Sequence, residues 1–291
     1  MAFRALLAIL LLAFTCAAAT LKPAASAQRK GASWQQLLFR TERLKLMTWN
    51  VGRARMNDEQ TARTDDLPHV IAVIERERPD VVALHELSAG PQLGLLARRL
   101  RAAYFGMVSG RRSLSLLLVR RRHKLINGFE IRTRVGRRAP ALVFERARVK
   151  DPITVVGLHA DPFDAARRRR YLEDLVAATR GRRGYVFLLG DFNLDVAGDA
   201  RQTADTASLS DRLVHDAESY TLLGQHFADL GKLAGATALL GRRLDYIFAR
   251  PRTVMVGKAL TLKEAIGDMD HQPLVVHADL RAQARVSLQR E

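Results

Sequence analysis

The segment Tyr185-Val-Phe-Leu-Leu-Gly-Asp-Phe-Asn193 joins a continuous apolar run directly to polar residues. An apolar run of this length predicts a β-strand that is buried on both faces. Gly190 lets the chain turn tightly where the strand ends, and Asp191 and Asn193 can both face one pocket. Taken alone, the motif fits an ordinary Asx turn as well as it fits a functional site.

Polar residues also stand beside several other apolar runs. They are Asn50, His85, Glu86, His159, Asp245, Asp270 and His271. Each of them, considered singly, is best interpreted as a surface residue. Their recurrence at predicted strand ends favours one shared site, because buried or half-buried carboxylates are costly unless they are paired or bind a metal.

The remaining pattern predicts an α/β fold. We expect helices at Leu67–Glu77, Leu93–Arg101, Ala165–Thr179 and Ser210–Leu223, and strands at Leu44–Trp49, Val81–Leu84, Leu114–Arg120, Leu142–Lys150, Ile153–Leu158, Tyr185–Leu189, Leu244–Phe248, Val254–Leu260 and Leu274–Leu280. Because helices separate some strands and hairpin-like connections separate others, two sheets should pack face to face with helices outside. One domain is expected at 45–281, after a linker at 28–44 and before a polar tail at 282–291.

The first residues of the chain have the features of a signal peptide. A short basic start at Met1–Arg4 precedes an apolar stretch at Ala5–Ala19, and Ala25-Ser26-Ala27 forms an A-x-A cleavage site. The apolar stretch is shorter than the ~20 residues that a membrane-spanning helix needs. We therefore expect residues 1–27 to be removed and the protein to be exported, periplasmic or secreted, rather than anchored in a membrane. A lipoprotein modified at Cys16 is a weaker alternative.

Charge and cysteine content limit the chemistry. Cys16 is the only cysteine, so the mature chain must use oxygen and nitrogen groups for catalysis. The formal net charge of +17 favours polyanionic partners such as nucleic acid. Arginines cluster at 98–101, 111–112, 120–122, 137–138, 167–170, 182–183 and 242–243. We expect several clusters to lie in loops around the site and to bind phosphate backbone, although each alone fits a solvated surface.

Six motifs resemble, in order and spacing, those of the endonuclease/exonuclease/phosphatase superfamily. They are Met47-Thr-Trp-Asn50-Val, Val82-Ala-Leu-His-Glu86, Gly157-Leu-His159, Gly190-Asp-Phe-Asn193, Arg243-Leu-Asp245-Tyr-Ile and Asp270-His271-Gln-Pro. The resemblance covers about residues 45–280. It implies a four-layered α/β sandwich with one active site at the sheet edges. It also implies hydrolysis of a phosphate ester by in-line attack of water, without a covalent intermediate.

The resemblance also implies roles for individual residues. The metal site would contain Asn50 and Glu86, with Asp270 nearby, and such oxygen ligands suit Mg²⁺, with Mn²⁺ or Ca²⁺ as alternatives. The catalytic residues would be His159, Asp191, Asn193, Asp245 and His271. In this scheme, His159 donates to the scissile phosphate. Asp191 and Asn193 orient or deprotonate the attacking water. The remaining pair acts as a unit, with Asp245 orienting His271 beside the phosphate or the water. The identity of the general base stays open.

Two positions depart from the family pattern. His85 stands where relatives usually have glutamine before the motif glutamate. Because Glu86 itself is present, we expect the metal site to be retained. The residues after Asn50 include no acid where some nucleases have one, which argues against a second metal contact.

The expected substrate is DNA or RNA, and the expected state is a monomer. Aromatic residues are sparse near the arginine clusters, which favours binding through the phosphate backbone over base stacking. The second candidate is a sphingomyelinase-like phospholipid phosphodiesterase, which would need an exposed hydrophobic hairpin, and the sequence has no aromatic-rich loop of that kind. A small-molecule phosphatase is the third candidate, and an adaptor that has lost catalysis is the fourth. Retention of Glu86, Asp191 and His271 argues against the adaptor.

Overall fold

The computed structural model describes residues 41–52, 66–88, 91–108, 113–196, 206–251 and 254–281. These residues belong to one compact unit, Phe39–Glu291. The predicted signal peptide, the tail at 282–291 and the linker before residue 41 lie outside the described residues, as do Arg111 and Arg112. In the described part of the chain, no helix has the length and apolar content needed to span a membrane.

The first sheet has six strands in the order β11-β12-β1-β2-β4-β3. Their bounds are β1 Thr41–Asn50, β2 Val81–Ser88, β3 Ala102–Val108, β4 Ser113–Arg120, β11 Met255–Thr261 and β12 Leu274–Arg281. The sheet is mixed, because β1 pairs with β2 in parallel and with β12 in antiparallel.

The second sheet has six strands in the order β5-β6-β7-β8-β10-β9. Their bounds are β5 Lys124–Arg132, β6 Arg138–Glu145, β7 Ile153–His159, β8 Tyr185–Asp191, β9 Ala228–Asp229 and β10 Asp245–Arg250. This sheet is also mixed, because β8 pairs with β7 in parallel and with β10 in antiparallel. All seven residues of β7 and of β8 are buried, as their apolar runs predict.

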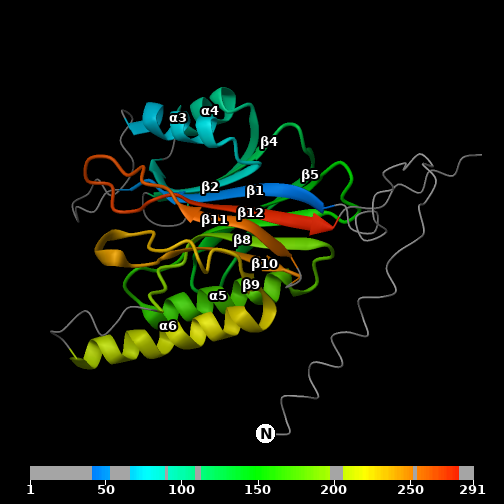
Figure 1. Cartoon of the computed structure of the whole chain (residues 1–291). Coiled ribbons are helices and arrows are strands. Elements are labelled where there is room, and N and C mark those ends of the chain that lie inside the picture. Colours follow the sequence, from blue (N-terminus) through cyan, green and yellow to red (C-terminus); the bar gives the residue numbers. More distant parts are fainter. Residues whose placement is uncertain are drawn as a thin grey trace, which may run out of the picture. The chain divides into compact units, whose positions relative to one another are not determined.

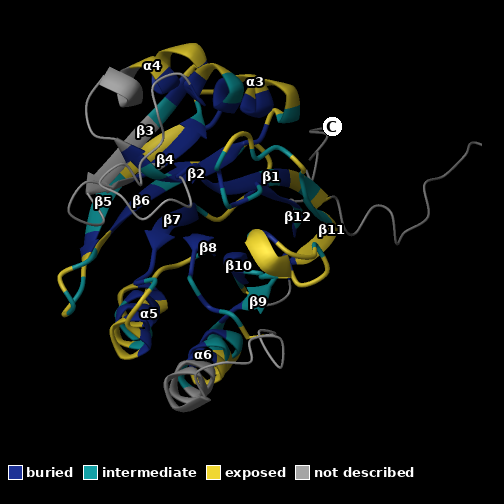
Figure 2. Ribbon diagram, turned by 90° about the vertical axis from the view of Figure 1, so that its left-hand side faces the viewer, coloured by how far each residue is buried: buried dark blue, intermediate teal, exposed yellow. Residues whose placement is uncertain are grey.

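Two pairs of helices cover the outer faces of the sheets. Helices α3 (Leu67–Glu77) and α4 (Pro91–Arg99) lie on the first sheet, and α5 (Ala165–Arg180) and α6 (Thr206–His226) lie on the second (Figure 1). Three apolar clusters fill the spaces between these layers, one between the sheets and one beneath each helix pair. The buried residues accordingly line the inner sides of the layers, and exposed residues lie on the outer sides of the helices and in turns and edge strands (Figure 2). The predicted four-layered α/β sandwich is therefore confirmed.

The differences from the predicted elements lie mostly at sheet edges. Strand β1 begins at Thr41, which pairs with Arg281, so residues 41–44 are strand and not linker. Strand β6 begins at Arg138, before the predicted Leu142, and contains Pro140, a residue that argues against an interior strand. The strands that the pattern did not predict are β3, β5 and β9. All three lie at sheet edges, and most of β5 is exposed, so no buried apolar run marks it.

Candidate active site

The two parallel strand pairs deliver polar side chains to one edge of the sandwich. At the end of the first pair Asn50 lies opposite His85, and at the end of the second pair His159 lies opposite Asp191. At the start of β10, Asp245 lies opposite Asp191. The structure thus brings together six of the predicted site residues. They are Asn50, Glu86, His159, Asp191, Asp245 and His271.

Glu86 reaches the site through an irregularity in β2. The pairing of β2 with β4 shifts register between Leu84 and Leu87, and Glu86 lies within this bulge with φ of 59°. A left-handed conformation costs a residue with a side chain about 1–2 kcal/mol. This local cost is offset by the surrounding sheet, and bulges of this kind commonly redirect a side chain beside an active site.

Asn50 joins the carboxylates of the two sheets. Its Nδ2 atom donates to Glu86 Oε1 at 2.9 Å and to Asp191 Oδ2 at 3.0 Å. Its Oδ1 atom accepts a hydrogen bond from the Gly52 backbone N–H at 2.9 Å. In this arrangement the Asn50 amide nitrogen lies between the two acids. The amide would have to rotate before its oxygen could face a cation.

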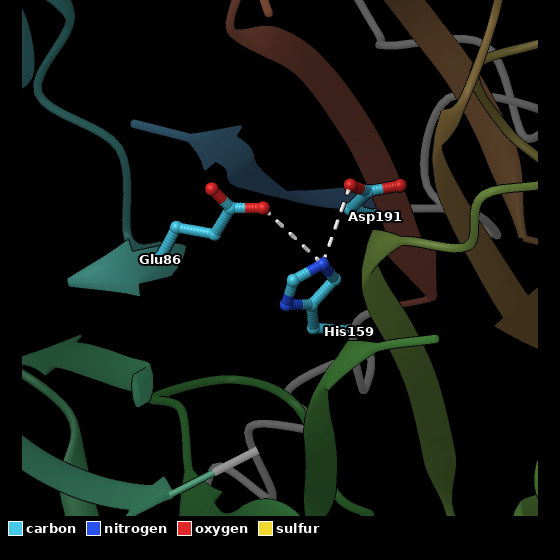
Figure 3. A group of neighbouring side chains, drawn as sticks. All are labelled: Glu86, His159 and Asp191. Atoms are coloured by element: carbon cyan, nitrogen blue, oxygen red, sulfur yellow. Dashed lines mark ion pairs between the residues drawn. The ribbon is translucent and has the colours of Figure 1, made fainter. Parts of the chain in front are cut away.

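His159 lies between the same two acids. Its Nε2 atom is 3.5 Å from Glu86 Oε1 and 3.7 Å from Asp191 Oδ2 (Figure 3). Burial lowers the pKa of His159 against the opposing effect of Asp191, and the nearby His85 and Arg137 also lower it, so that the pKa is about 3. The imidazole is therefore neutral near pH 7 and can donate one hydrogen bond from Nε2. Its buried Nδ1 atom has no hydrogen-bond partner among the described residues.

Asp191 is held by the turn at the end of β8. Its Oδ1 atom accepts a hydrogen bond from the Asn193 backbone N–H at 2.9 Å. A Cβ atom at Gly190 would lie 1.8 Å from the Leu158 carbonyl oxygen, so only glycine fits before this aspartate. The side chain of Asn193 donates to the Ala160 carbonyl at 3.3 Å, and Asn193 therefore also fixes the adjoining loop.

His271 and Asp245 form a buried pair on the other side of Asp191. His271 Nδ1 is 2.7 Å from Asp245 Oδ2, and His271 Nε2 is 3.8 Å from Asp191 Oδ2. Burial by itself would lower the pKa of His271, but the charges of Asp245 and Asp191 outweigh it and raise the pKa to about 10. The two carboxylates thus favour the protonated imidazole.

Several supporting residues were not apparent from the sequence. The buried Thr237 hydroxyl accepts the backbone N–H groups of Leu244 and Asp245 at 3.1 and 3.0 Å. The indole of Trp49 donates to the His271 carbonyl at 3.1 Å. Trp49 belongs to the first motif and Thr237 to none, but the contacts of both join segments that are far apart along the chain, so only the folded arrangement identifies these contacts.

His85, the residue that departs from the family pattern, is buried beside His159. Its Nδ1 atom is 3.0 Å from Ser115 Oγ, its Nε2 atom is 3.4 Å from Thr48 Oγ1, and its ring centroid is 5.9 Å from that of His159. Burial lowers the pKa of His85 to about 3, and the charge of His271 adds to this effect. His85 is therefore a neutral, hydrogen-bonded packing residue near pH 7.

The carboxylates of this group fit a hard divalent cation. One ligand atom each from Glu86, His159 and Asp191 lie within 4.8 Å of one another, and so do atoms from Asp191, Asp245 and His271. Burial raises the pKa of Glu86, the hydrogen bond from Asn50 and the charge of His271 oppose the increase, and the charges of Asp191 and Asp270 add to it, so that the pKa is about 7. Among the described residues, neither Glu86 nor Asp191 has a lysine or arginine partner. A divalent cation would offset this concentration of negative charge.

Asp270 lies beside this group rather than within it. It belongs to neither set of mutually close ligand atoms. Burial raises its pKa, and the charge of Asp191 adds to the increase against the opposing effect of His271. The charge of Asp270 in turn raises the pKa values of Glu86 and His271.

Two of the arginine clusters that were predicted to lie around the site are near it, but their arginines are paired with acids. Arg137 donates to the His159 carbonyl at 3.0 Å but is paired with Asp161, and Arg242 is paired with Asp195 at 2.8 Å. The rim instead exposes an apolar turn, Leu239–Gly241, whose Leu239 backbone N–H donates to the Asp270 carbonyl. Leu239 is 56% exposed and Leu240 is 77% exposed.

Several solved structures share this fold. An endonuclease/exonuclease/phosphatase family protein from Bacteroides thetaiotaomicron has a TM-score of 0.63 at 15% identity, over 83% of this chain and 99% of that chain. An AP endonuclease from Archaeoglobus fulgidus has a TM-score of 0.60 at 17% identity, over 80% and 98%. The human Nocturnin catalytic domain with bound sulfate has a TM-score of 0.58 at 20% identity, over 82% and 97%. At these identities the likeness shows the fold alone.

The sequence comparison identifies the family directly. No curated protein sequence matches the chain. The family model described as endonuclease/exonuclease/phosphatase family matches residues 47–268, which contain five of the six motifs in full and end two residues before the last. The chain therefore belongs to the endonuclease/exonuclease/phosphatase family, whose members are divalent-metal-dependent hydrolases that act on phosphate esters.

Proposed function

We propose that this protein is an exported, Mg²⁺-dependent phosphodiesterase that cleaves nucleic acid. The observation that supports it most is the convergence of Asn50, Glu86, His159 and Asp191 with the Asp245–His271 pair at one edge of the sandwich. These groups come from both sheets, and a purely structural role would not require two acids without a lysine or arginine partner among the described residues to face one another there.

The proposed chemistry follows from the positions of the side chains. Glu86, next to Asp191 and Asp270, would hold the cation, which supplies charge neutralisation at the phosphate oxygens when bound. The neutral His159 would donate from Nε2 to a phosphate oxygen. Asp191 would orient the attacking water. Asp245 keeps the Nε2 edge of His271 directed toward Asp191.

The choice of nucleic acid as substrate rests on charge and on the kinds of protein that share the fold. A net charge of +17 favours a polyanionic substrate. One of the similar structures is named an AP endonuclease. Neither observation distinguishes DNA from RNA, so both belong in the assay.

A substrate panel tests the proposal. The purified protein would be assayed on plasmid DNA, RNA, bis-p-nitrophenyl phosphate and sphingomyelin liposomes, with Mg²⁺, Mn²⁺ or Ca²⁺ and with EDTA. We expect cleavage of nucleic acid and of the small diester with a divalent ion and none in EDTA. Full activity in EDTA, or cleavage of lipid without cleavage of nucleic acid, contradicts the proposal.

A phospholipid phosphodiesterase is the second candidate, and one observation favours it. The sequence contains no aromatic-rich hairpin, but the structure exposes Leu239 and Leu240 beside the His271 segment. Apolar side chains at the rim of a site can enter a lipid interface. A Leu239→Ser/Leu240→Ser variant would lose liposome hydrolysis if lipid is the substrate, and would keep its activity on bis-p-nitrophenyl phosphate.

Export is a separate part of the proposal. It rests on the leader at residues 1–27 with its A-x-A site. Expression of the whole chain in a Gram-negative host, followed by fractionation and N-terminal sequencing, should give a periplasmic or secreted protein that starts at Gln28. An intact N-terminus in the cytoplasmic fraction contradicts this part alone.

A further inference from the structure

A groove lined by arginines lies at the end of β2 that is remote from Glu86. It encloses about 600 Å³ and is lined by Glu75, Arg78, Arg99, Leu100, Arg101, Arg120, Arg121 and Arg122. These residues come from the ends of α3 and α4, the start of β3 and the end of β4.

The register of β2 separates this groove from the active site. The Arg120 backbone N–H donates to the Asp80 carbonyl just before β2, whereas Glu86 lies near the opposite end of the strand. Asp80 and Glu86 are about 20 Å apart along the strand, at 3.2–3.4 Å per residue. A group bound in the groove would therefore not touch the site residues.

Most of the charge in the groove is not neutralised by the protein. Arg78, Arg99, Arg101 and Arg121 are exposed, and none of them has a side-chain hydrogen bond or ion pair to a described residue. Burial lowers the pKa of Arg120, and the positive charges of Arg122 and Arg78 lower it further.

The remaining two arginines have protein partners. Arg120 donates to the Pro79 carbonyl at 2.6 Å, and Arg122 pairs with Asp80. Glu75 is the one carboxylate among the lining residues. The groove therefore concentrates positive charge instead of distributing it in ion pairs.

Helix ends explain only part of this charge. Arginines favour helix C-termini, and α3 and α4 both end here, each contributing about half a negative charge. Six arginines and one glutamate leave five positive charges, of which the two helix ends offset about one. The arginine cluster on α5 is different, because Arg168 pairs with Asp216 and Arg169 pairs with Glu173 and Glu218.

We propose that this groove binds the phosphate backbone of the nucleic acid substrate at a distance from the bond that is cleaved. The proposal rests on the proposed nuclease function. Guanidinium groups bind phosphate oxygens in bidentate geometry, and several of them along a groove suit the repeated phosphates of a strand. A membrane surface fits less well, because Leu100 is the only apolar lining residue and is 5% exposed.

The test compares a groove variant with a variant of equal charge. Arg99→Glu/Arg121→Glu changes two exposed groove residues, and Arg170→Glu/Arg183→Glu changes two exposed arginines at α5 and the loop after it. Binding of a short fluorescein-labelled DNA would be measured by anisotropy over a salt series in an Asp191→Asn background with Mg²⁺, which prevents cleavage. We expect about tenfold weaker binding and a salt slope smaller by about two for the groove variant only.

Two further measurements separate the possible failures. In the catalytically intact background, both variants should hydrolyse bis-p-nitrophenyl phosphate at the wild-type rate, because this substrate is too small to reach the groove. Equal DNA affinity in the two variants, or a groove variant that loses phosphatidylserine vesicle binding instead of DNA binding, overturns the proposal. If the intact protein binds DNA through the groove but cleaves no diester, the binding inference stands and the proposed nuclease function fails.

Discussion

The two ends of β2 differ in the sign and the burial of their charged groups. At the end near Glu86, buried acids and imidazoles face one another, and their closest described neighbours are an amide and other titratable groups. At the end near Asp80, exposed arginines surround one buried acid. Asp80 itself contacts Arg122, His123 and Arg146, so its charge is fully paired.

The comparison separates a structural acid from functional ones. A buried carboxylate that is surrounded by cationic partners is stabilised by the protein alone. Among the described residues, neither Glu86 nor Asp191 has a lysine or arginine partner, and the protonated His271 lies 3.8 Å from Asp191 alone. A divalent cation or a substrate would offset the remaining negative charge. Neutralising an acid at each end should therefore have different consequences.

The largest expected effect is on turnover at the Glu86 end. Asp191→Asn keeps the size of the side chain but removes the charge that orients water beside His271. We expect kcat on bis-p-nitrophenyl phosphate to fall by about 10²–10⁴-fold. Asp80→Asn is the matched control, since it also neutralises one buried acid on the same sheet, and it should keep most of the turnover under conditions where it is folded. Similar turnover in both variants would contradict the division of roles.

Cation binding gives the second contrast, and it can be measured without turnover. Saturating Mg²⁺ should raise the melting temperature of the wild type, because a ligand at 100 times its Kd stabilises the folded state by about 2.7 kcal/mol. Glu86→Gln should lose most of this shift, whereas Asp80→Asn should retain it. If Mg²⁺ raises the melting temperature of Glu86→Gln as much as that of the wild type, the cation does not bind at Glu86.

Stability is the third contrast, and here the Asp80 end should dominate. Asp80→Asn removes the negative charge beside Arg122 and His123, and its amide nitrogen cannot accept the Lys45 backbone N–H that Asp80 Oδ2 accepts. The substitution should therefore cost about 1–3 kcal/mol of unfolding free energy. Burial raises the pKa of Asp80, but hydrogen bonds from His123, the Lys45 backbone N–H and Arg122 outweigh it and hold the pKa well below its usual range.

The direction of the pH dependence follows from this depressed pKa. Because the folded-state pKa lies below the unfolded value, the stabilisation is complete above about pH 4 and is lost as the pH falls below it. Urea denaturation between pH 3 and pH 7 should show that the stability gap between wild type and Asp80→Asn closes toward acid. If the stability difference between wild type and Asp80→Asn is constant over this range, protonation of Asp80 does not cause the loss of stability in acid.

The fold and the grouping of the candidate site residues were predictable where the sequence carries buried patterns. Fully buried strands such as β7 and β8 appear as apolar runs, and the polar residues that follow them mark the site. The edge strand β5 has no such run, because its exposed positions accept almost any residue. The positive backbone angle of Glu86 and the contacts of Thr237 depend on tertiary pairing, which single-chain spacing does not encode.

The arginine clusters show the limit of charge counting. The sequence predicts that several of them surround the site, but Arg137 and Arg242 near the site are paired with acids. Four exposed arginines without a partner among the described residues lie instead in the groove at the other end of β2. Pairing depends on acids that are distant in the chain, such as Asp195 for Arg242 and Asp216 for Arg168. The number of charges was therefore predictable and their location was not.

The smallest expected effect concerns His85, where relatives usually have glutamine. The side chain is buried, its pKa is lowered to about 3 by burial, and its two ring nitrogens face Ser115 and Thr48. A glutamine amide can replace both contacts without adding a charge, so His85→Gln should change kcat by less than about tenfold, or 1.4 kcal/mol. The pH–rate profile between pH 5 and pH 9 should keep its shape, because the replaced imidazole does not titrate in that range. His85→Leu, which removes both hydrogen bonds, is the control and should lower the melting temperature more than His85→Gln. A displaced pH optimum in His85→Gln would contradict this prediction. It would indicate that His85 takes part in proton transfer and belongs to the site together with Glu86.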